Sequence, residues 1–223
     1  MRQVDTVLFD FDGTVMDTTE VIVNSWQHTF KTLEGKERPL SEIYVTFGEP
    51  LPITMAKFFP EHPVEDCIEI YRSYHYNNFG DLIKVFPGMK ELMVELREEG
   101  YTLALVTSRL LRTTMQGLDA YDLKKYFDTI LTCEDTDKHK PDPAPIDITL
   151  KRLGKKPDNA IMIGDTMFDI LCAKNAGVKS VLVDWAVAVG EEEREGENAP
   201  DYIIKDPVEI KDILDSLNAE GKS

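Results

Sequence analysis

The 223-residue sequence has few cysteines and no long hydrophobic run. Its three cysteines, Cys67, Cys133 and Cys172, are odd in number and lack CxxC spacing, so the sequence indicates neither a disulfide framework nor a zinc site. No apolar run approaches the roughly 18 residues of a membrane-spanning helix. The N-terminus carries no signal-peptide pattern, so we expect a cytoplasmic protein that does not enter membranes.

Basic residues are also scarce, because 25 Lys and Arg stand against 41 Asp and Glu, which gives a net charge of −16. Such a field disfavours binding to nucleic acid and to anionic membranes. It would also repel a phosphorylated ligand, so a site for one needs a divalent cation and a few local basic side chains. With 42% hydrophobic and 30% charged residues, the chain is expected to form one globular core and a smaller module.

The most informative stretch is residues 7–14, which reads VLFDFDGT. An apolar run that ends at a turn signal is typical of a buried strand in a parallel α/β sheet, and ligands bind at the carboxyl ends of such strands. Asp10 and Asp12 point to the same side of an extended chain, where two close carboxylates favour a shared cation. Alternatively, this stretch is only a turn, since Asp and Gly are common turn formers.

Three further patterns follow this stretch in the chain. They are an apolar run ending at Thr107-Ser108, Lys140 before Pro141-Asp142-Pro143, and an apolar run ending at Gly164-Asp165 with Asp169 four residues later. Together with Asp10 to Thr14, they closely resemble the four motifs of the haloacid dehalogenase superfamily of phosphohydrolases. All four occur in the family's order across essentially the whole chain. Four motifs in order are far more specific than one.

The coarse pattern of the chain is that of an α/β protein with a helical insertion. From residue 86 onward, apolar runs alternate with helical periodicity, which indicates βαβ units. Between Met16 and Lys84 we expect helices and no strand, with a capping box from Asp17 to Glu20. The resemblance implies a Rossmann-like parallel-sheet core with an inserted small α-helical cap domain. We assign residues 1–15 and 87–223 to the core and residues 16–86 to the cap.

The resemblance also assigns roles in phosphoryl transfer. Asp10 would be the nucleophile that forms an aspartyl-phosphate, which divides a difficult displacement into two easier steps. Asp12 would be the general acid/base, and its presence favours phosphate chemistry because the dehalogenase branch lacks this residue. Thr107 and the backbone of Ser108 would bind a phosphoryl oxygen, and Lys140 would neutralise charge beside Asp10. Taken alone, a Thr at a strand end is ordinary.

A Mg²⁺ site is the second implication of the resemblance. The direct ligands would be Asp10, Asp165 and the backbone carbonyl of Asp12, with Asp169 in the outer shell. An oxygen-only set of this kind suits Mg²⁺, which binds a few carboxylates together with waters and substrate phosphate. Asp169 is also favoured near a helix N-terminus by the helix dipole alone.

Specificity is expected to come from the cap, which would close over the pocket and exclude water. Gly48, Arg72 and His75 are candidate substrate contacts on the cap. Arg109 and Arg112 follow the second motif and could contact the substrate, although exposed surface arginines are at least an equal expectation.

Mg²⁺-dependent hydrolysis of a small phosphorylated metabolite is the leading hypothesis. Among family members, the chain looks most like phosphoglycolate phosphatases and inorganic pyrophosphatases, and residues 107–109 and 138–143 favour the latter. Because a fold does not determine a substrate, a phosphosugar mutase of the β-phosphoglucomutase type is the alternative. A non-enzymatic phospho-aspartate signalling module is a third hypothesis, disfavoured by Asp12 and by the length of the insertion. A monomer and a homodimer are equally expected.

Overall fold

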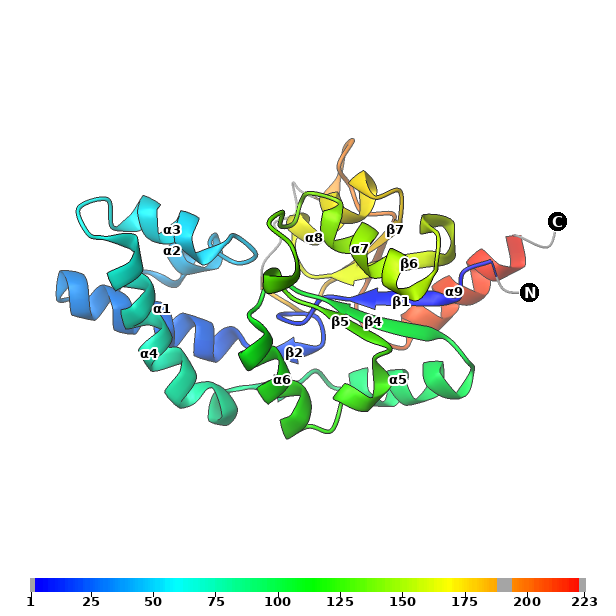
Figure 1. The fold of residues 1–223 in the computed structure, drawn as a ribbon, viewed down its shortest axis with the longest axis horizontal. Helices are drawn as coiled ribbons and strands as arrows, with labels where there is room; N and C mark the ends of the chain where they lie inside the picture. Colours follow the sequence, from blue (N-terminus) through cyan, green and yellow to red (C-terminus); the bar gives the residue numbers. More distant parts are fainter. Residues whose placement is uncertain (1–2, 188–193, 221–223) are drawn as a thin grey trace.

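The computed structural model describes residues 3–187 and 194–220, and its centre is a six-stranded parallel sheet (Figure 1). The strand order is β5-β4-β1-β6-β7-β8. The strands are β1 (Thr6–Phe9), β4 (Thr102–Val106), β5 (Thr129–Leu131), β6 (Ala160–Gly164), β7 (Lys179–Val183) and β8 (Tyr202–Ile204). Each pairs in parallel with its neighbours, so all six carboxyl ends lie at one edge of the sheet.

Side chains of the central strands alternate between two hydrophobic clusters, one on each face of the sheet. In β1, Val7 and Phe9 belong to the larger cluster and Leu8 to the smaller one. All three side chains are fully buried, which explains why β1 reads as a continuous apolar run rather than an alternating one. The buried strand predicted before Asp10 is therefore confirmed.

Helices cover both faces of this sheet (Figure 1). The larger cluster includes residues of α5 (Met89–Glu98), α6 (Leu111–Ala120) and α9 (Glu209–Glu220). The smaller cluster includes residues of α7 (Ala144–Leu153) and α8 (Met167–Asn175) on the other face. Short 3-10 helices span Lys124–Tyr126, Cys133–Asp135 and Pro157–Asn159. The Rossmann-like α/β core is thus confirmed.

A helical segment lies at one side of the sheet, at the left of Figure 1. It consists of α1 (Thr19–Glu34), α2 (Leu40–Tyr44), α3 (Leu51–Phe58) and α4 (Val64–Leu82). Its aromatic residues form a third hydrophobic cluster, in which Trp26 stacks on Phe30 with ring centroids 5.6 Å apart. The segment therefore buries apolar surface of its own. Among the described residues, no helix is long and apolar enough to cross a membrane.

Two expectations about this segment were wrong. Short strands, β2 (Met16–Asp17) and β3 (Lys84–Val85), pair antiparallel where the chain enters and leaves the helices. Two-residue strands carry no periodicity, so the sequence does not reveal them. The capping box is also absent, because α1 is capped by Thr18 without a side-chain hydrogen bond. The Thr18 hydroxyl instead donates to Asp12 Oδ1 at 2.6 Å.

Candidate active site

The parallel strands bring three predicted site residues to one edge of the sheet. Asp10 follows β1, Thr107 follows β4 and Asp165 follows β6, and these three strands are direct neighbours. The ladder continues one residue beyond β1, since the Asp10 backbone N–H donates to the Ile163 carbonyl at 2.9 Å. The side chain of Asp10 is therefore held at the carboxyl edge, where open α/β sheets bind ligands.

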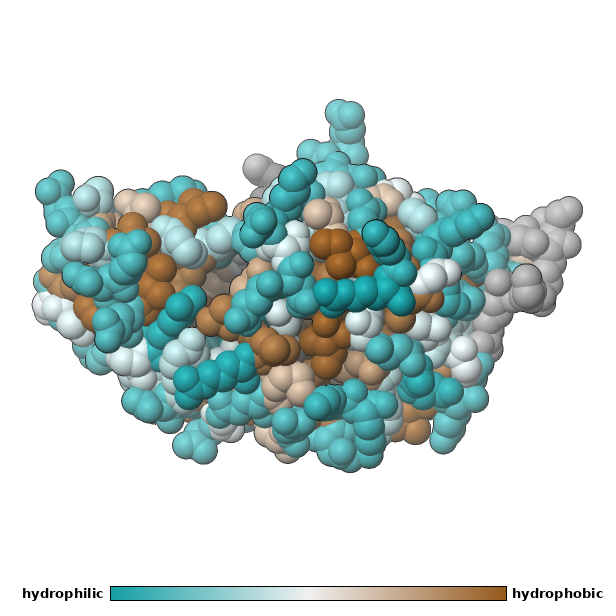
Figure 2. Space-filling model, in the orientation of Figure 1, coloured by the Kyte–Doolittle hydropathy of each residue, from teal (hydrophilic) through white to brown (hydrophobic). Residues whose placement is uncertain are grey.

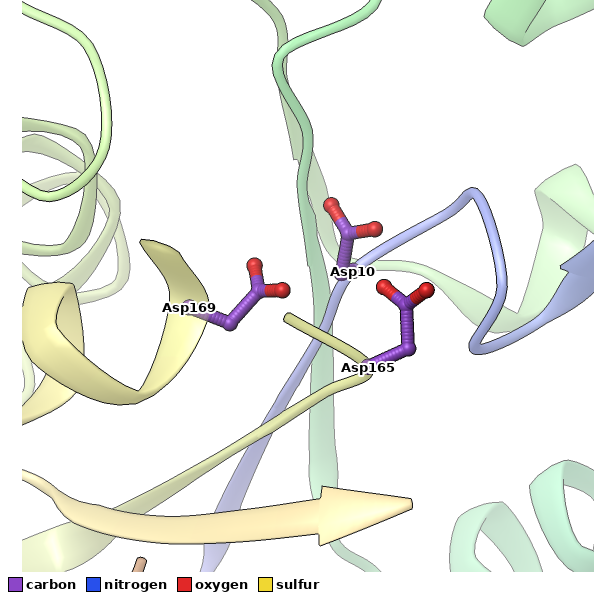
Figure 3. Close-up of side chains that lie close together, drawn as sticks. All are labelled: Asp10, Asp165 and Asp169. Carbon is purple, nitrogen blue, oxygen red and sulfur yellow. The ribbon is translucent and has the colours of Figure 1, made fainter. Parts of the chain in front are cut away.

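Asp10, Asp165 and Asp169 form a buried acidic cluster whose carboxylates face one another (Figure 3). One carboxylate oxygen of each lies within 4.8 Å of the other two. Asp169 is placed by its position in the first turn of α8, where it and Thr166 complete a capping box. The three residues are 7%, 4% and 2% exposed, so the cluster is largely withdrawn from water.

Lys140 is the basic side chain that pairs with this cluster. Its Nζ donates to Asp10 Oδ1 at 2.7 Å and to Asp169 Oδ1 at 2.6 Å. These two carboxylates raise the pKa of Lys140 against the opposing effect of burial, so the amine stays charged. The other oxygen of Asp169 accepts hydrogen bonds from the backbone N–H and hydroxyl of Thr166. Both Asp169 oxygens are thus engaged, as an outer-shell position would require.

One lysine does not balance three carboxylates, and the pKa values reflect this. Burial, together with Asp169 and Asp12, raises the pKa of Asp10 to about 7 despite Lys140. Burial and the neighbouring Asp169 and Asp10 raise the pKa of Asp165 well above its ordinary value. No described residue donates a hydrogen bond to the Asp165 carboxylate. Buried carboxylate oxygens that lack a donor are the ligands a hard divalent cation such as Mg²⁺ prefers, so the residues fit this metal.

Asp12 lies beside the cluster but pairs with a different cation. Arg109 holds both of its oxygens, with Nη2 to Oδ1 at 2.6 Å and Nε to Oδ2 at 3.0 Å. Burial raises the pKa of Asp12, but the Arg109 and Thr18 contacts outweigh burial and lower it. Asp12 is therefore ionised near neutral pH in this arrangement.

The two arginines of the second motif have different surroundings. The Arg109 side chain is only 8% exposed, so the expectation of an exposed surface arginine does not hold for it. Arg112 is exposed, and its guanidinium lies 4.6 Å from the centre of the Tyr76 ring. Helix α6 begins at Leu111, so the chain turn between β4 and α6 carries Arg109 inward and leaves Arg112 on the helix surface.

A cavity of about 490 Å³ lies above the acidic cluster, between the strand ends and the helical segment. Its wall includes Thr107, Ser108, Gly48, Arg72 and His75, so the remaining predicted contacts surround one space. Figure 2 shows a recess between the helical segment and the rest of the molecule on a largely hydrophilic face.

The helical segment touches α8 directly at Gly48, whose φ of +81° favours glycine. A Cβ added there would lie 2.7 Å from the Phe168 ring, closer than atoms can pack. Gly48 therefore allows the backbone to approach α8 closely, which a residue with a Cβ would prevent.

The model of the haloacid dehalogenase-like hydrolase family matches residues 7–183. The chain belongs to this family. A proposed pyrophosphatase PpaX of Caldanaerobacter subterraneus is 37% identical over 212 residues, which cover 95% of this chain and 95% of that protein. Pyrophosphatase PpaX of Halalkalibacterium halodurans is 34% identical over 212 residues, covering 95% and 97% of the two chains. A haloacid dehalogenase-like family hydrolase from Streptococcus pneumoniae has a TM-score of 0.84 at 27% identity, covering 95% and 99%.

Family membership confirms the predicted resemblance and the prediction of a haloacid dehalogenase-type hydrolase. What the sequence missed in this haloacid dehalogenase-like hydrolase is the surroundings of Asp12. Neither the bidentate Arg109 nor the Thr18 hydroxyl was expected there. The one available signal was an arginine two residues after the strand-end Thr107, and that position alone does not distinguish an inward from an outward side chain.

Proposed function

We propose that this haloacid dehalogenase-like hydrolase cleaves a small phosphorylated metabolite through an aspartyl-phosphate on Asp10, with inorganic pyrophosphate or phosphoglycolate as its substrate. The observation that carries the proposal is the placement of Asp10, buried at a strand end between Lys140 and two further carboxylates. The relatives named pyrophosphatase PpaX support pyrophosphate. Structures of two proposed phosphoglycolate phosphatases are 22% and 23% identical to this chain, so they support the fold alone.

The reaction would take place in two steps. An Asp10 oxygen forms a bond to phosphorus while the bond from phosphorus to the leaving oxygen breaks, and the leaving group takes the electron pair. Asp12 then accepts a proton from water, the water oxygen attacks phosphorus, and the bond from Asp10 to phosphorus breaks. Thr107, the backbone of Ser108 and Lys140 would hold the phosphoryl oxygens.

The ionised state of Asp12 favours pyrophosphate within this scheme. A carboxylate with a lowered pKa is a weak proton donor but is ready to act as a base. Orthophosphate is a much better leaving group than an alkoxide, so cleavage of pyrophosphate needs little help from a general acid. An alkyl phosphate would require Asp12 to be protonated first, against the charge of Arg109.

Mg²⁺ would be held by Asp10, Asp165 and the backbone carbonyl of Asp12, with Asp169 in the outer shell. When bound, the metal would neutralise charge between the substrate and the carboxylates. Lys140 supplies one positive charge there already, through its contact with Asp10. The donor-free carboxylate of Asp165 supports this assignment.

We also propose a division of the chain into a core and an inserted cap. We assign residues 16–86 to a cap and residues 1–15 and 87–223 to the core, with the paired β2 and β3 at the junctions. Arg72 and Gly48 line the cavity from the cap and would contact the substrate. We place the enzyme in the cytoplasm without a nucleic-acid partner, as a monomer or a homodimer. Light scattering after size exclusion distinguishes these two states.

The test is phosphate release with Mg²⁺ across pyrophosphate, 2-phosphoglycolate, sugar phosphates and nucleotides, with Asp10→Asn as the control. We expect a single strong substrate and no turnover by the variant. Dependence on a bisphosphorylated sugar without net phosphate release would instead support a phosphosugar mutase. A long-lived phosphoprotein with no turnover would support a signalling module. Unimpaired turnover by Asp10→Asn would refute the nucleophile.

A further inference from the structure

Arg109 is buried at the active site by contacts from two parts of the chain, the loop after β1 and helix α4. Two of its nitrogens hold the Asp12 carboxylate, and its guanidinium lies 4.7 Å from the centre of the Phe79 ring. Its Nη1 lies 2.9 Å from His75 Nε2 on α4. The residue therefore joins the catalytic edge of the sheet to the helical segment.

The hydrogen bonds around His75 determine which of its ring nitrogens carries the proton. The Ser25 hydroxyl donates to the Val21 carbonyl at 2.5 Å, so its oxygen accepts from His75 Nδ1, 3.2 Å away. With its proton on Nδ1, His75 presents a lone pair at Nε2 to the Arg109 N–H. Burial and the Arg109 charge lower the pKa of His75 to about 3, which keeps the ring neutral. His75 is thus a neutral acceptor that positions Arg109.

Arg109 retains hydrogen-bonding capacity toward the cavity. A guanidinium carries five N–H groups, and the described contacts use Nε, one N–H of Nη2 and one of Nη1. One N–H on each terminal nitrogen has no partner among the described residues, and Arg109 lines the cavity. Such a planar pair of terminal nitrogens suits a phosphate or carboxylate.

The other charged side chains of the cavity wall are less suited to this task. Arg72 is the other arginine of the cavity wall, and it lies on α4 with no described contact to Asp10 or Asp12, so nothing places it on the leaving-group side. Lys140 is already paired with Asp10 and Asp169. Glu49 is paired with Lys57, and Glu134 accepts the Leu111 backbone N–H, so neither acidic side chain is paired with Arg109. Arg109 is therefore a cation of the cavity wall that contacts the general acid/base and still has two N–H groups without a described partner.

We propose that Arg109 is a specificity-determining residue that binds a second anionic group of the substrate, and that His75 positions it for this contact. The proposal rests on the proposed function, in which Asp12 activates the water that attacks phosphorus from the side the leaving group has vacated. Since Arg109 contacts Asp12, it lies on the leaving-group side of the transferred phosphoryl group. The substrate class is a phosphoryl compound with a phosphate or carboxylate within a few bonds, as in pyrophosphate or 2-phosphoglycolate.

The test compares Arg109→Gln with wild type on pyrophosphate, 2-phosphoglycolate and p-nitrophenyl phosphate, whose leaving group has no second anion. For whichever of pyrophosphate and 2-phosphoglycolate is the substrate, both of which carry a second anionic group, we expect kcat/KM to fall about 10- to 100-fold, chiefly through KM. For p-nitrophenyl phosphate we expect a smaller loss, confined to kcat, because the contact of Arg109 with Asp12 is lost but no contact with the leaving group is. Arg112→Gln, which alters a nearby exposed arginine in the first turn of α6, is the matched control and is expected to leave both reactions unchanged. A larger fall in kcat/KM for pyrophosphate identifies the second group as phosphate, and a larger fall for 2-phosphoglycolate identifies it as carboxylate.

Equal losses on all substrates, in kcat and not in KM, would overturn the proposal, because they would mean that Arg109 only orients Asp12. Binding provides a separate readout, with free Mg²⁺ held in excess. Wild type is expected to bind methylenebisphosphonate at least about tenfold more tightly than methylphosphonate, and Arg109→Gln to lose this preference. Equal binding of the two ligands by wild type would also overturn it.

This design separates the two proposals. If no phosphate compound is hydrolysed in an Asp10-dependent manner, the proposed function fails while the binding preference still decides the role of Arg109. If Arg109→Gln does not fold, Arg109→Lys keeps the charge but removes the paired N–H geometry, and it is expected to lose most of the preference for methylenebisphosphonate. If Arg109→Lys keeps the full preference for methylenebisphosphonate, recognition by the guanidinium is refuted.

Discussion

Metal-free Asp10→Asn protein is expected to be more stable than wild type at about pH 8, with a much smaller advantage at about pH 5. In the folded protein, burial raises the pKa of Asp10 to about 7 from its ordinary value of 3.8. Between these values the folded state keeps a proton that the unfolded state has released. The free energy of unfolding of the wild type therefore falls as pH rises through this interval.

The size of the effect follows from the interval that the experiment spans. From about pH 5 to a folded pKa of about 7, at roughly 1.36 kcal/mol per pH unit, the wild type loses about 3 kcal/mol. Asparagine does not ionise, and Asp169 remains as the ionic partner of Lys140. We therefore expect the variant to gain about 2–3 kcal/mol over wild type between the two pH values.

Urea unfolding with a chelator present, from about pH 5 to pH 8, measures this gain. Asp215→Asn is the control, because Asp215 is an exposed residue on α9 and its loss removes one negative charge without touching the cluster. A variant whose free energy of unfolding follows that of wild type at every pH would refute the reasoning. So would a variant that is less stable than wild type at about pH 8.

Three further predictions concern the same site. Gly13 has φ +70°, and an added Cβ would overlap the Asp165 carboxylate. Gly13→Ala is therefore expected to abolish hydrolysis and to lower the free energy of unfolding by more than about 2 kcal/mol. Gly35→Ala, at φ +74° with open space around the Cβ, is expected to lower it by about 1 kcal/mol and to keep full activity. Thermal unfolding and rate assays compare them, and equal effects would contradict the close packing. Mg²⁺ is expected to raise the melting temperature of wild type but not of Asp165→Asn, and an equal rise in both would place the metal elsewhere. His75→Leu is expected to raise KM for pyrophosphate about 3- to 10-fold, whereas His75→Gln, which keeps an acceptor for Arg109, should recover most of this loss; a fall confined to kcat would argue against positioning.

Local sequence patterns were sufficient to predict the main strands and the residues that follow them. Phe9 and Asp10 illustrate this, because a continuous apolar run ending in a carboxylate indicates both a buried strand and its carboxyl end. Since the sheet is parallel, such ends meet at one edge wherever the strands come in the sequence. The acidic cluster of Asp10, Asp165 and Asp169 could thus be anticipated from strand ends and the family's motifs, before any distance was known.

What only the tertiary structure decided is how the charges of the site are paired. Lys140 had been assigned to Asp10, but its second contact with Asp169 depends on how the loop before α7 packs against α8. Asp12 and Arg109 are 97 positions apart, and His75 reaches them from a helix of the inserted segment. Local patterns report which backbone conformation a stretch prefers and which side it buries. They carry no information on which distant side chain fills the space beside a buried charge, because that pairing is determined by the packing of segments that meet only in the folded protein.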